Sequence, residues 1–294
     1  MNDPGVVGFI GLGAMGSPMS RHLLEAGWRV VGYDVSAQAM ERHRGHGGHT
    51  VEHPSGLRGI AEVVLTSLPS ACALDSSLAA LADGSSAPTR ILELSTLTLE
   101  QKEAAREQAS AAGMRLLDCP VSGTSAQAEK GDLVAYLSGA DDDDHSAVDP
   151  VLADMTRGVY DLGPFGNGIR LKLVANLLVA IHNLSSAEAL LLAERSGLDL
   201  ASALPTLLDG AGASKMLEVR GPLMLAGNYD NATARVEVFR KDLRAIQQLA
   251  DGLGVPTPLL SVTAMIYAAA AGQGFSQQDT ACVFPVLKTL AGID

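Results

Sequence analysis

The stretch Val6–Gly16, which reads VVGFIGLGAMG, decides the fold of this chain. It begins with the apolar run VVGFI, which is typical of a strand buried on both faces of a sheet. The pattern Gly11-x-Gly13-x-x-Gly16 follows at once, and an amphipathic helical pattern then continues to Ala26. A strand, a glycine loop and a helix in this order predict a βα unit.

The three glycines of this loop predict a specific chemistry. Gly11 permits a tight turn, Gly13 allows the backbone to approach a pyrophosphate, and Gly16 allows the helix to pack closely on the strand. The pyrophosphate is expected at the helix N-terminus, where N–H groups bind anions. A glycine-rich turn without a ligand is the alternative. The residues of this predicted dinucleotide site are Gly11, Leu12, Gly13, Ala14, Met15 and Gly16.

An acidic residue ends the second predicted strand. Asp34 lies 23 positions after Gly11, where a carboxylate accepts hydrogen bonds from the adenosine ribose hydroxyls. The same carboxylate repels a 2′-phosphate, which favours NAD over NADP. Arg42 and Arg44 weaken this preference, because a nearby arginine binds such a phosphate. A solvated strand-end carboxylate is the alternative.

The rest of the first half continues the alternation of strands and helices. Continuous apolar strands separated by helices require a parallel sheet covered on both faces, so we predict a doubly wound Rossmann-type α/β domain. The other strands are expected at Arg29–Tyr33, Val63–Ser67, Ile91–Leu94, Met114–Leu117, Leu133–Leu137 and Gly158–Leu162.

The character of the chain changes in the glycine-rich segment Gly163–Gly168. Ile169–Arg195 contains neither glycine nor proline and predicts one long helix. We therefore expect two domains, an NAD-binding domain over residues 1–164 and an all-α substrate and dimerisation domain over residues 165–294. The further helices are expected at Leu200–Leu208, Lys215–Leu225, Val236–Leu253 and Leu259–Ala271.

The composition limits the classes of function. The net charge of −12, from 33 acidic and 21 basic residues, repels phosphate backbones, so we expect no nucleic-acid partner. Three cysteines without CxxC spacing fit a reducing cytoplasm better than a disulfide framework or a zinc ribbon. The first residues lack a basic leader, and no stretch reaches the roughly 20 apolar residues that cross a bilayer. We expect a soluble cytoplasmic protein without a membrane partner.

Two polar clusters suggest metal chemistry at first sight. Four histidines fall between His43 and His53, but no cysteine lies near them, and we expect no physiological metal. The acidic run Asp141–Asp144 is typical of a helix start, where carboxylates favour the positive end of the helix dipole.

Four motifs in the same order resemble the β-hydroxyacid dehydrogenase family. They are Gly8–Gly16, Asp118–Gly123 (DCPVSG), Gly166–Gly168 followed by Lys172 and Asn176, and Lys241–Leu243 (KDL). The resemblance covers nearly the whole chain. It implies an NAD-dependent oxidoreductase that interconverts a short β-hydroxy acid and its oxo acid by hydride transfer. The family's substrates include 3-hydroxyisobutyrate, glycerate with tartronate semialdehyde, and threonate-like sugar acids.

The resemblance implies that Lys172 and Asn176 are catalytic. They are four residues apart on the predicted long helix and share one face. A lysine whose pKa is lowered by burial accepts and returns the hydroxyl proton, while an asparagine orients the substrate. A surface lysine beside an unrelated asparagine is the alternative. The family often has two adjacent asparagines, whereas this chain has Ala175 before Asn176.

The resemblance also places the substrate carboxylate on Ser122, Gly123 and Thr124. A hydroxyl and free backbone N–H groups in such a loop bind an anion. Thr124 replaces a family glycine, so we expect a narrower pocket or a more hydroxylated acid. An ordinary loop that caps the next helix is the alternative.

Further cofactor contacts are implied at three other positions along the chain. Leu68, Pro69 and Thr96 follow predicted strands, at the edge where a doubly wound sheet binds its cofactor. Lys241 reaches the cofactor from the helical domain, with an exposed pair to Glu237 as the alternative.

Some alternatives stay open. A non-catalytic NAD(P)-binding or sensing protein needs only the glycine fingerprint, and a methyltransferase also uses a glycine loop. An NADP-dependent semialdehyde or imine reductase shares the fold, although imine reductases usually lack a lysine at the position of Lys172. In the helical domain, Lys215 and Arg220 are candidates for a charged substrate contact. The long apolar helix predicts a homodimer or homotetramer.

Overall fold

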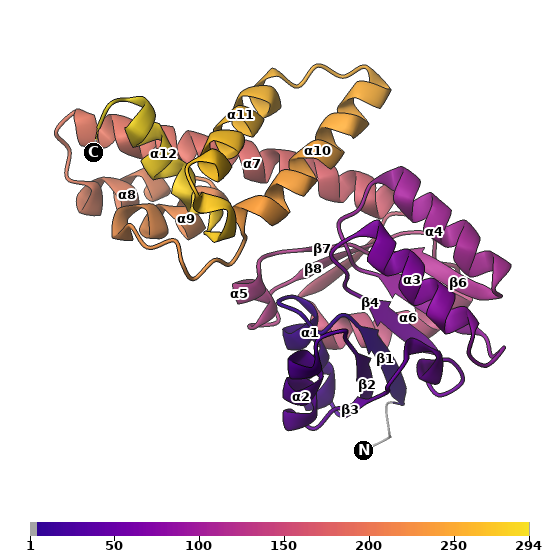
Figure 1. Ribbon diagram of the computed structural model, residues 1–294. Helices are drawn as coiled ribbons and strands as arrows, with labels where there is room; N and C mark the ends of the chain where they lie inside the picture. The colour runs from indigo at the N-terminus through magenta and orange to yellow at the C-terminus, as the bar shows by residue number, and fades with distance from the viewer. Residues whose placement is uncertain (1–4, 294) are drawn as a thin grey trace. The chain divides into compact units, whose positions relative to one another are not determined.

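The N-terminal half is built on a six-stranded parallel sheet in the order β3-β2-β1-β4-β5-β6 (Figure 1). This computed structural model describes residues 5–293 and divides into two units, Met1–Lys172 and Leu173–Asp294. The first four residues, which belong to the segment where we expected no leader, lie outside the described range. The strands are β1 (Val6–Ile10), β2 (Arg29–Tyr33), β3 (His49–Thr50), β4 (Val63–Thr66), β5 (Thr89–Glu93) and β6 (Met114–Asp118).

Helices cover both faces of this sheet. One core cluster joins Phe9 of β1 to α1, α2 and α6, and the other joins Ile10 of the same strand to α3 and α4. Successive side chains of a strand point to opposite faces, so one apolar strand contributes to both clusters. The predicted doubly wound α/β fold is thereby confirmed. The helices are α1 (Gly16–Glu25), α2 (Ala37–Gly45), α3 (Ala71–Ala82), α4 (Leu99–Ala111) and α6 (Asp142–Met155), with a short 3-10 turn at Pro54–Leu57.

The last strands of this unit form a sheet of their own. β7 (Val121–Ser122) pairs antiparallel with β8 (Val134–Leu137), and β8 pairs parallel with β9 (Gly158–Asp161). The strands predicted at Leu133–Leu137 and Gly158–Leu162 are thus present, and they lie in this second sheet. The connection from β7 to β8 contains only the four-residue helix α5 (Ser125–Ala128), and a short connection suits antiparallel neighbours.

The acidic run begins a helix, as predicted. Asp141 is the N-cap of α6, and its carboxylate accepts the backbone N–H of Asp144 at 3.0 Å. The side chain of Asp144 in turn accepts the N–H of Asp141 at 3.0 Å, so the two acids close a capping box. The run therefore stabilises the fold.

The C-terminal unit is helical. It contains α8 (Leu200–Asp209), α9 (Lys215–Ala226), α10 (Val236–Leu253), α11 (Pro258–Gly272) and α12 (Val283–Leu290), with 3-10 turns at Phe275–Gln277 and Thr280–Cys282. Asn183 holds the core of this unit together, because its side-chain amide donates to Tyr267 Oη at 2.7 Å and to the Thr280 carbonyl at 2.9 Å. The Tyr267 ring packs on Phe239 with 5.4 Å between centroids.

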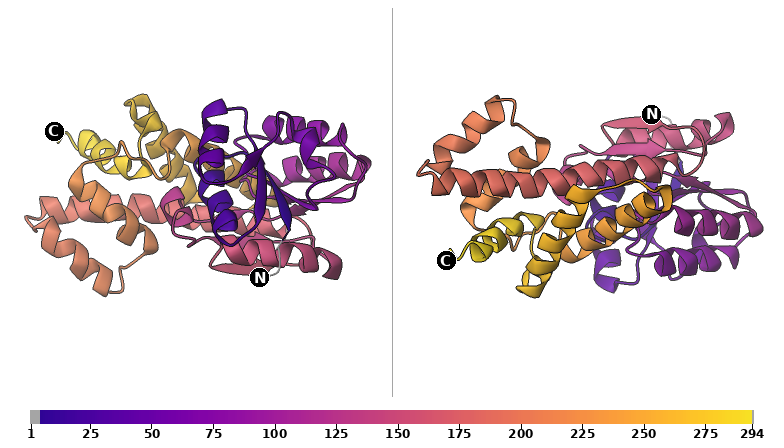
Figure 2. Two further views of the ribbon diagram at one scale, coloured as in Figure 1. Left: turned by 90° about the horizontal axis from the view of Figure 1, so that it is seen from below. Right: turned by 90° about the horizontal axis from the view of Figure 1, so that it is seen from above.

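The helix α7 (Asn167–Arg195) begins in the first unit and continues into the second. Figure 2 shows it as one continuous helix. By length and composition it is able to cross a membrane, with a mean hydropathy of 1.3, although 44% of that window is buried inside the protein. We expected no stretch that is apolar enough to cross a bilayer, and this expectation is wrong for α7. The leucine and alanine content of α7 outweighs its few polar residues. Core helices of water-soluble proteins have the same composition.

Candidate active site

The loop between β1 and α1 needs each of its three glycines for a different reason. Gly11 has φ +94°, and a Cβ there would collide with the Ser67 carbonyl oxygen. A Cβ on Gly16 would collide with the Gly11 carbonyl oxygen, so the first turn of α1 rests directly on the loop. A Cβ on Gly13 would meet no heavy atom within 4 Å. Packing does not explain Gly13, and the open space beside its backbone fits the approach of a phosphate group.

Asp34 ties the end of β2 to this loop. One carboxylate oxygen accepts the backbone N–H of Leu12 at 2.7 Å, and the other accepts the N–H of Ser36 at 2.7 Å. The acid thus lies beside the dinucleotide loop, at the strand end where this fold binds an adenosine ribose. Arg44 is engaged elsewhere, with Glu41 and with Thr50 Oγ1 at 2.8 Å. The residues present fit a nicotinamide dinucleotide.

Three neighbouring strands bring the other predicted cofactor residues of this unit to the same edge. Leu68 and Pro69 follow β4, and Thr96 follows β5, which are the two strands that succeed β1 in the sheet. The Leu68 N–H donates to Ser95 Oγ at 2.8 Å, so the two strand-end loops are hydrogen-bonded to each other. Their cofactor role stays a prediction, but their position at the carboxyl edge is the one that it requires.

A buried ionic cluster lies at the end of β6, and sequence reasoning missed it. The ammonium group of Lys102 is 2.6 Å from Glu93 Oε2 and 2.7 Å from Asp118 Oδ1, and all three side chains have no solvent exposure. Burial alone lowers the pKa of Lys102, but the two carboxylates outweigh it and leave the pKa raised. The sequence offered a weak signal, since Asp118 and Glu93 both end apolar strands.

This cluster anchors the first turn of α7. Asp118 Oδ2 accepts the Ile169 N–H at 2.8 Å and the Ser138 hydroxyl at 3.0 Å. Ser138 Oγ also accepts the Gly168 N–H at 3.0 Å. A carboxylate at this position satisfies N–H groups that a helix start leaves without partners. The helix that carries Lys172 is therefore fixed to the carboxyl edge of the sheet.

Lys172 lies three residues after Ile169, and its side chain is 7% exposed. Lys172 is therefore buried, which contradicts the alternative of a surface lysine. The catalytic role of Lys172 stays a prediction. Asn176 follows four residues later on α7 and is 5% exposed. Its side-chain amide donates to Asp242 Oδ2 at 3.1 Å.

Asp242 was not among the predicted site residues. It lies in the Lys-Asp-Leu motif beside Lys241, and that motif was the signal that could have identified it. The Lys241 ammonium group is 3.5 Å from Asp242 Oδ1, and no ion pair with Glu237 occurs in the described part of the chain. Asp242 thus connects the predicted cofactor lysine to the predicted catalytic asparagine.

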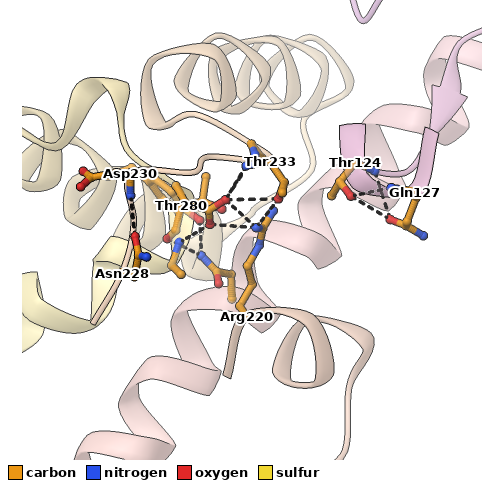
Figure 3. Close-up of polar contacts among 12 residues, drawn as sticks. Thr124, Gln127, Arg220, Asn228, Asp230, Thr233 and Thr280 are labelled. Carbon is orange, nitrogen blue, oxygen red and sulfur yellow. Dashed lines mark hydrogen bonds and ion pairs between the residues drawn. The ribbon is translucent and has the colours of Figure 1, made fainter. Parts of the chain in front are cut away.

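The predicted carboxylate loop follows β7. Ser122 ends the strand. Gly123 has φ +140°, which favours glycine, and a Cβ there would also approach the Leu133 side chain at 2.5 Å. Thr124 is the N-cap of α5 and forms a capping box with Gln127 (Figure 3). The Thr124 side chain therefore has the capping role of the alternative interpretation. The carboxylate role of Ser122, Gly123 and Thr124 stays a prediction.

The two charged candidates from the helical unit lie in different environments. Arg220 is 2% exposed and donates to Asp279 Oδ2 at 2.7 Å. It also donates to Thr233 Oγ1 at 2.7 Å (Figure 3). It is a buried part of the fold. Lys215 pairs with Glu218 at 2.8 Å on the surface of α9.

Among the clustered histidines, His43 is buried in the fold. Over residues 5–293, no group of three or more metal-ligating side chains comes together. His43 is 2% exposed, and burial lowers its pKa. Its ring nitrogens lie 3.4 Å from Ser20 Oγ and 3.3 Å from the Val30 carbonyl. It packs α2 onto the sheet.

Comparison with known proteins agrees with this architecture. Residues 6–163 match the family described as the NAD binding domain of 6-phosphogluconate dehydrogenase. Residues 166–287 match the family described as NAD-binding of NADP-dependent 3-hydroxyisobutyrate dehydrogenase. Both matches support binding of a nicotinamide dinucleotide, NAD(P).

Full-length relatives agree as well. L-threonate dehydrogenase of Cupriavidus necator is 31% identical, over 98% of this chain and 97% of the relative. 3-Sulfolactaldehyde reductase of Escherichia coli is 28% identical, over 98% and 97%. The crystal structure of 3-hydroxyisobutyrate dehydrogenase from Salmonella typhimurium superposes with a TM-score of 0.86 at 27% identity, over 96% of this chain and 99% of that one. The chain therefore belongs to the β-hydroxyacid dehydrogenase family, as an NAD(P)-dependent oxidoreductase that acts on a CH–OH group.

Proposed function

We propose that this protein interconverts a short β-hydroxy acid and its oxo acid with NAD, and that Lys172 is the general acid and base. The substrate class comprises 3-hydroxyisobutyrate, glycerate with tartronate semialdehyde, and threonate-like sugar acids. The observation that carries the proposal is the burial of Lys172 on a helix whose first turn is bound to Asp118, at the carboxyl edge where the dinucleotide loop also lies. A non-catalytic dinucleotide sensor has no need for a buried lysine there.

Each site residue has a defined task in this proposal. Ser122 and Gly123 bind the substrate carboxylate, and Asn176 orients the hydroxyl, with Asp242 holding its amide. Lys172 accepts the hydroxyl proton during oxidation and returns it during reduction. When bound, NAD supplies the acceptor for the hydride that leaves the β-carbon.

The preference for NAD rests on Asp34. Its carboxylate is fixed beside the glycine loop by the Leu12 N–H, so a 2′-phosphate on the ribose meets a negative charge. Arg44, which could have neutralised that phosphate, is already paired with Glu41. We propose NAD as the physiological cofactor, with NADP used less well.

The domain roles and assembly are proposals as well. We assign cofactor binding to residues 1–164 and substrate binding with dimerisation to residues 165–294. Leu259, Val262 and Met265 of α11 are 61%, 52% and 68% exposed at a spacing of three residues. Such an apolar face favours a homodimer or homotetramer. The cytoplasm supplies NAD and suits the free thiols.

The test is an NAD-reduction screen over C3 to C6 hydroxy acids, followed by the Lys172→Ala variant. We expect Lys172→Ala to abolish turnover while NAD still stabilises the protein in a thermal-shift measurement. Lys288→Ala, which removes a half-buried lysine paired with Glu194, is the control and retains turnover. Near-normal turnover by Lys172→Ala, or no turnover of any acid by the wild type, overturns the proposal.

A further inference from the structure

The side chain of Gln127 occupies a backbone donor of the carboxylate loop. Its Oε1 accepts the Thr124 N–H at 3.0 Å, while its own backbone N–H donates to Thr124 Oγ1 at 3.4 Å (Figure 3). The Thr124 N–H is one of the groups that the loop would otherwise offer to an anion.

Both ends of the Gln127 carboxamide are fixed. Its Nε2 donates to Asp132 Oδ2 at 3.2 Å, and Asp132 Oδ1 lies 2.7 Å from Arg157 Nε. The amide orientation follows from these partners, because the reverse orientation would place an NH2 group against the Thr124 N–H. The Gln127 oxygen is therefore held on the Thr124 N–H by the contacts that its amide nitrogen makes with Asp132.

This arrangement changes the number of donors that the loop presents. The Ser122 hydroxyl and the Gly123 N–H take part in none of the hydrogen bonds found over residues 5–293. With the Thr124 N–H occupied by the Gln127 oxygen, two donors remain. A carboxylate has two oxygens in one plane and matches two donors. A sulfonate has three oxygens in a tripod, one more than the remaining donors, so one of its oxygens is left without a donor.

We infer that Gln127 is a specificity-determining residue that selects a carboxylate over a sulfonate at this loop. The inference rests on the proposed function, because that proposal places the substrate's acid group on Ser122 and Gly123. Thr124 supports the selection through its side chain, which adds bulk where a glycine would leave space. The two residues together make the loop specific for a planar acid group.

The test compares two anions that differ only in this group, 3-hydroxypropanoate and 2-hydroxyethanesulfonate. Titration calorimetry on the NAD-loaded full-length protein gives a Kd for each. We expect wild type to bind the carboxylate more tightly. In Gln127→Ala the freed Thr124 N–H should tighten sulfonate binding roughly 10-fold to 100-fold, as for one regained hydrogen bond to a charged group, with a smaller change for the carboxylate.

A second capping box of the same type provides the control. Thr98 and Gln101 form it at the start of α4, with the Thr98 N–H donating to Gln101 Oε1 at 3.0 Å. Gln101→Ala should lose a similar amount of thermal stability but leave the ratio of the two Kd values unchanged. This variant separates loss of a cap from a change in recognition.

Each outcome decides between the possibilities. An unchanged Kd ratio in a folded Gln127→Ala protein overturns the role of Gln127, whether or not the enzyme turns over a hydroxy acid. A wild-type protein that binds both anions equally overturns it as well, and one that binds neither overturns the loop as the acid site. If the screen finds no turnover of any hydroxy acid but Gln127→Ala alters the Kd ratio, the proposed reaction is rejected and the specificity role of Gln127 is retained.

Discussion

Replacing Lys102 by methionine should reveal how strongly the buried ionic cluster stabilises the N-terminal unit. Methionine has a similar length and no charge, so the variant removes the ammonium group while it fills most of the same space. Glu93 and Asp118 then remain without their shared counter-ion, and both side chains are fully buried. Asp118 keeps its bonds from Ile169 and Ser138, whereas Glu93 keeps only the Ser95 N–H at 2.9 Å.

The magnitude follows from the burial of the cluster. Removing one partner of a buried ion pair typically costs about 3–5 kcal/mol, because an uncompensated charge stays in the interior. The three side chains have no exposed surface, so solvent cannot screen the two remaining carboxylates. For a unit of this size 1 kcal/mol corresponds to roughly 2–4 °C in Tm, so we expect Tm to fall by about 6–20 °C.

The assay is thermal and urea unfolding of Lys102→Met, with Lys130→Met as the control at an exposed lysine. The pKa of Lys102 is raised from 10.5, so its contribution is fully present below that value and disappears as pH rises through the folded pKa. The contribution of Lys102 to the stability of the wild type should therefore be intact at neutral pH and decline above about pH 10. A loss of unfolding free energy below 1 kcal/mol would refute the reasoning. So would a Glu93→Gln, Lys102→Met double variant that is no more stable than Lys102→Met.

Three further predictions concern other parts of the chain. Asp34→Ser should raise the Kd for NAD and lower the ratio of the NADP Kd to the NAD Kd, measured by titration of both cofactors. An unchanged ratio contradicts the proposed selectivity for NAD. Arg220→Met should destabilise the helical unit by about 3–5 kcal/mol in urea unfolding, because Asp279 stays buried without its partner; a loss under 1 kcal/mol counts against that role. Iodoacetamide should label Cys72, which is exposed, and spare Cys119 in the folded protein, because burial raises the pKa of the Cys119 thiol; equal labelling by mass spectrometry contradicts this.

Much of the fold was predictable because its signals are local. The strand Val6–Ile10, the helix through Arg195 and the acidic helix start at Asp141 were all predicted from short-range patterns, and the structure confirms them. The two-residue strands escaped prediction, since His49–Thr50 and Val121–Ser122 are too short for a period to appear. The separate three-stranded sheet depends on pairing between segments, which no single segment encodes.

The candidate site also contains residues that local sequence patterns identify and partner residues that they do not. The glycine loop and Asp34 were found because the spacing of a dinucleotide fingerprint is a property of the chain. The partners of the predicted residues were not found, because Lys102 and Asp118 are 16 residues apart, and Asn176 and Asp242 are 66 apart. Arg220 seemed available for substrate until its burial against Asp279 was seen. Sequence pattern does not show which charges face each other in the interior.

The sequence by itself determined that this chain forms a doubly wound dinucleotide-binding fold followed by helices, because periodicity and glycine spacing act over a few residues. Only the tertiary structure decided that Asp118 caps the helix of Lys172, that Asp242 holds Asn176, and that Gln127 occupies the Thr124 N–H. Each of these polar groups could pair with several partners along the chain. Burial removes water and leaves one geometry in which each buried donor meets an acceptor.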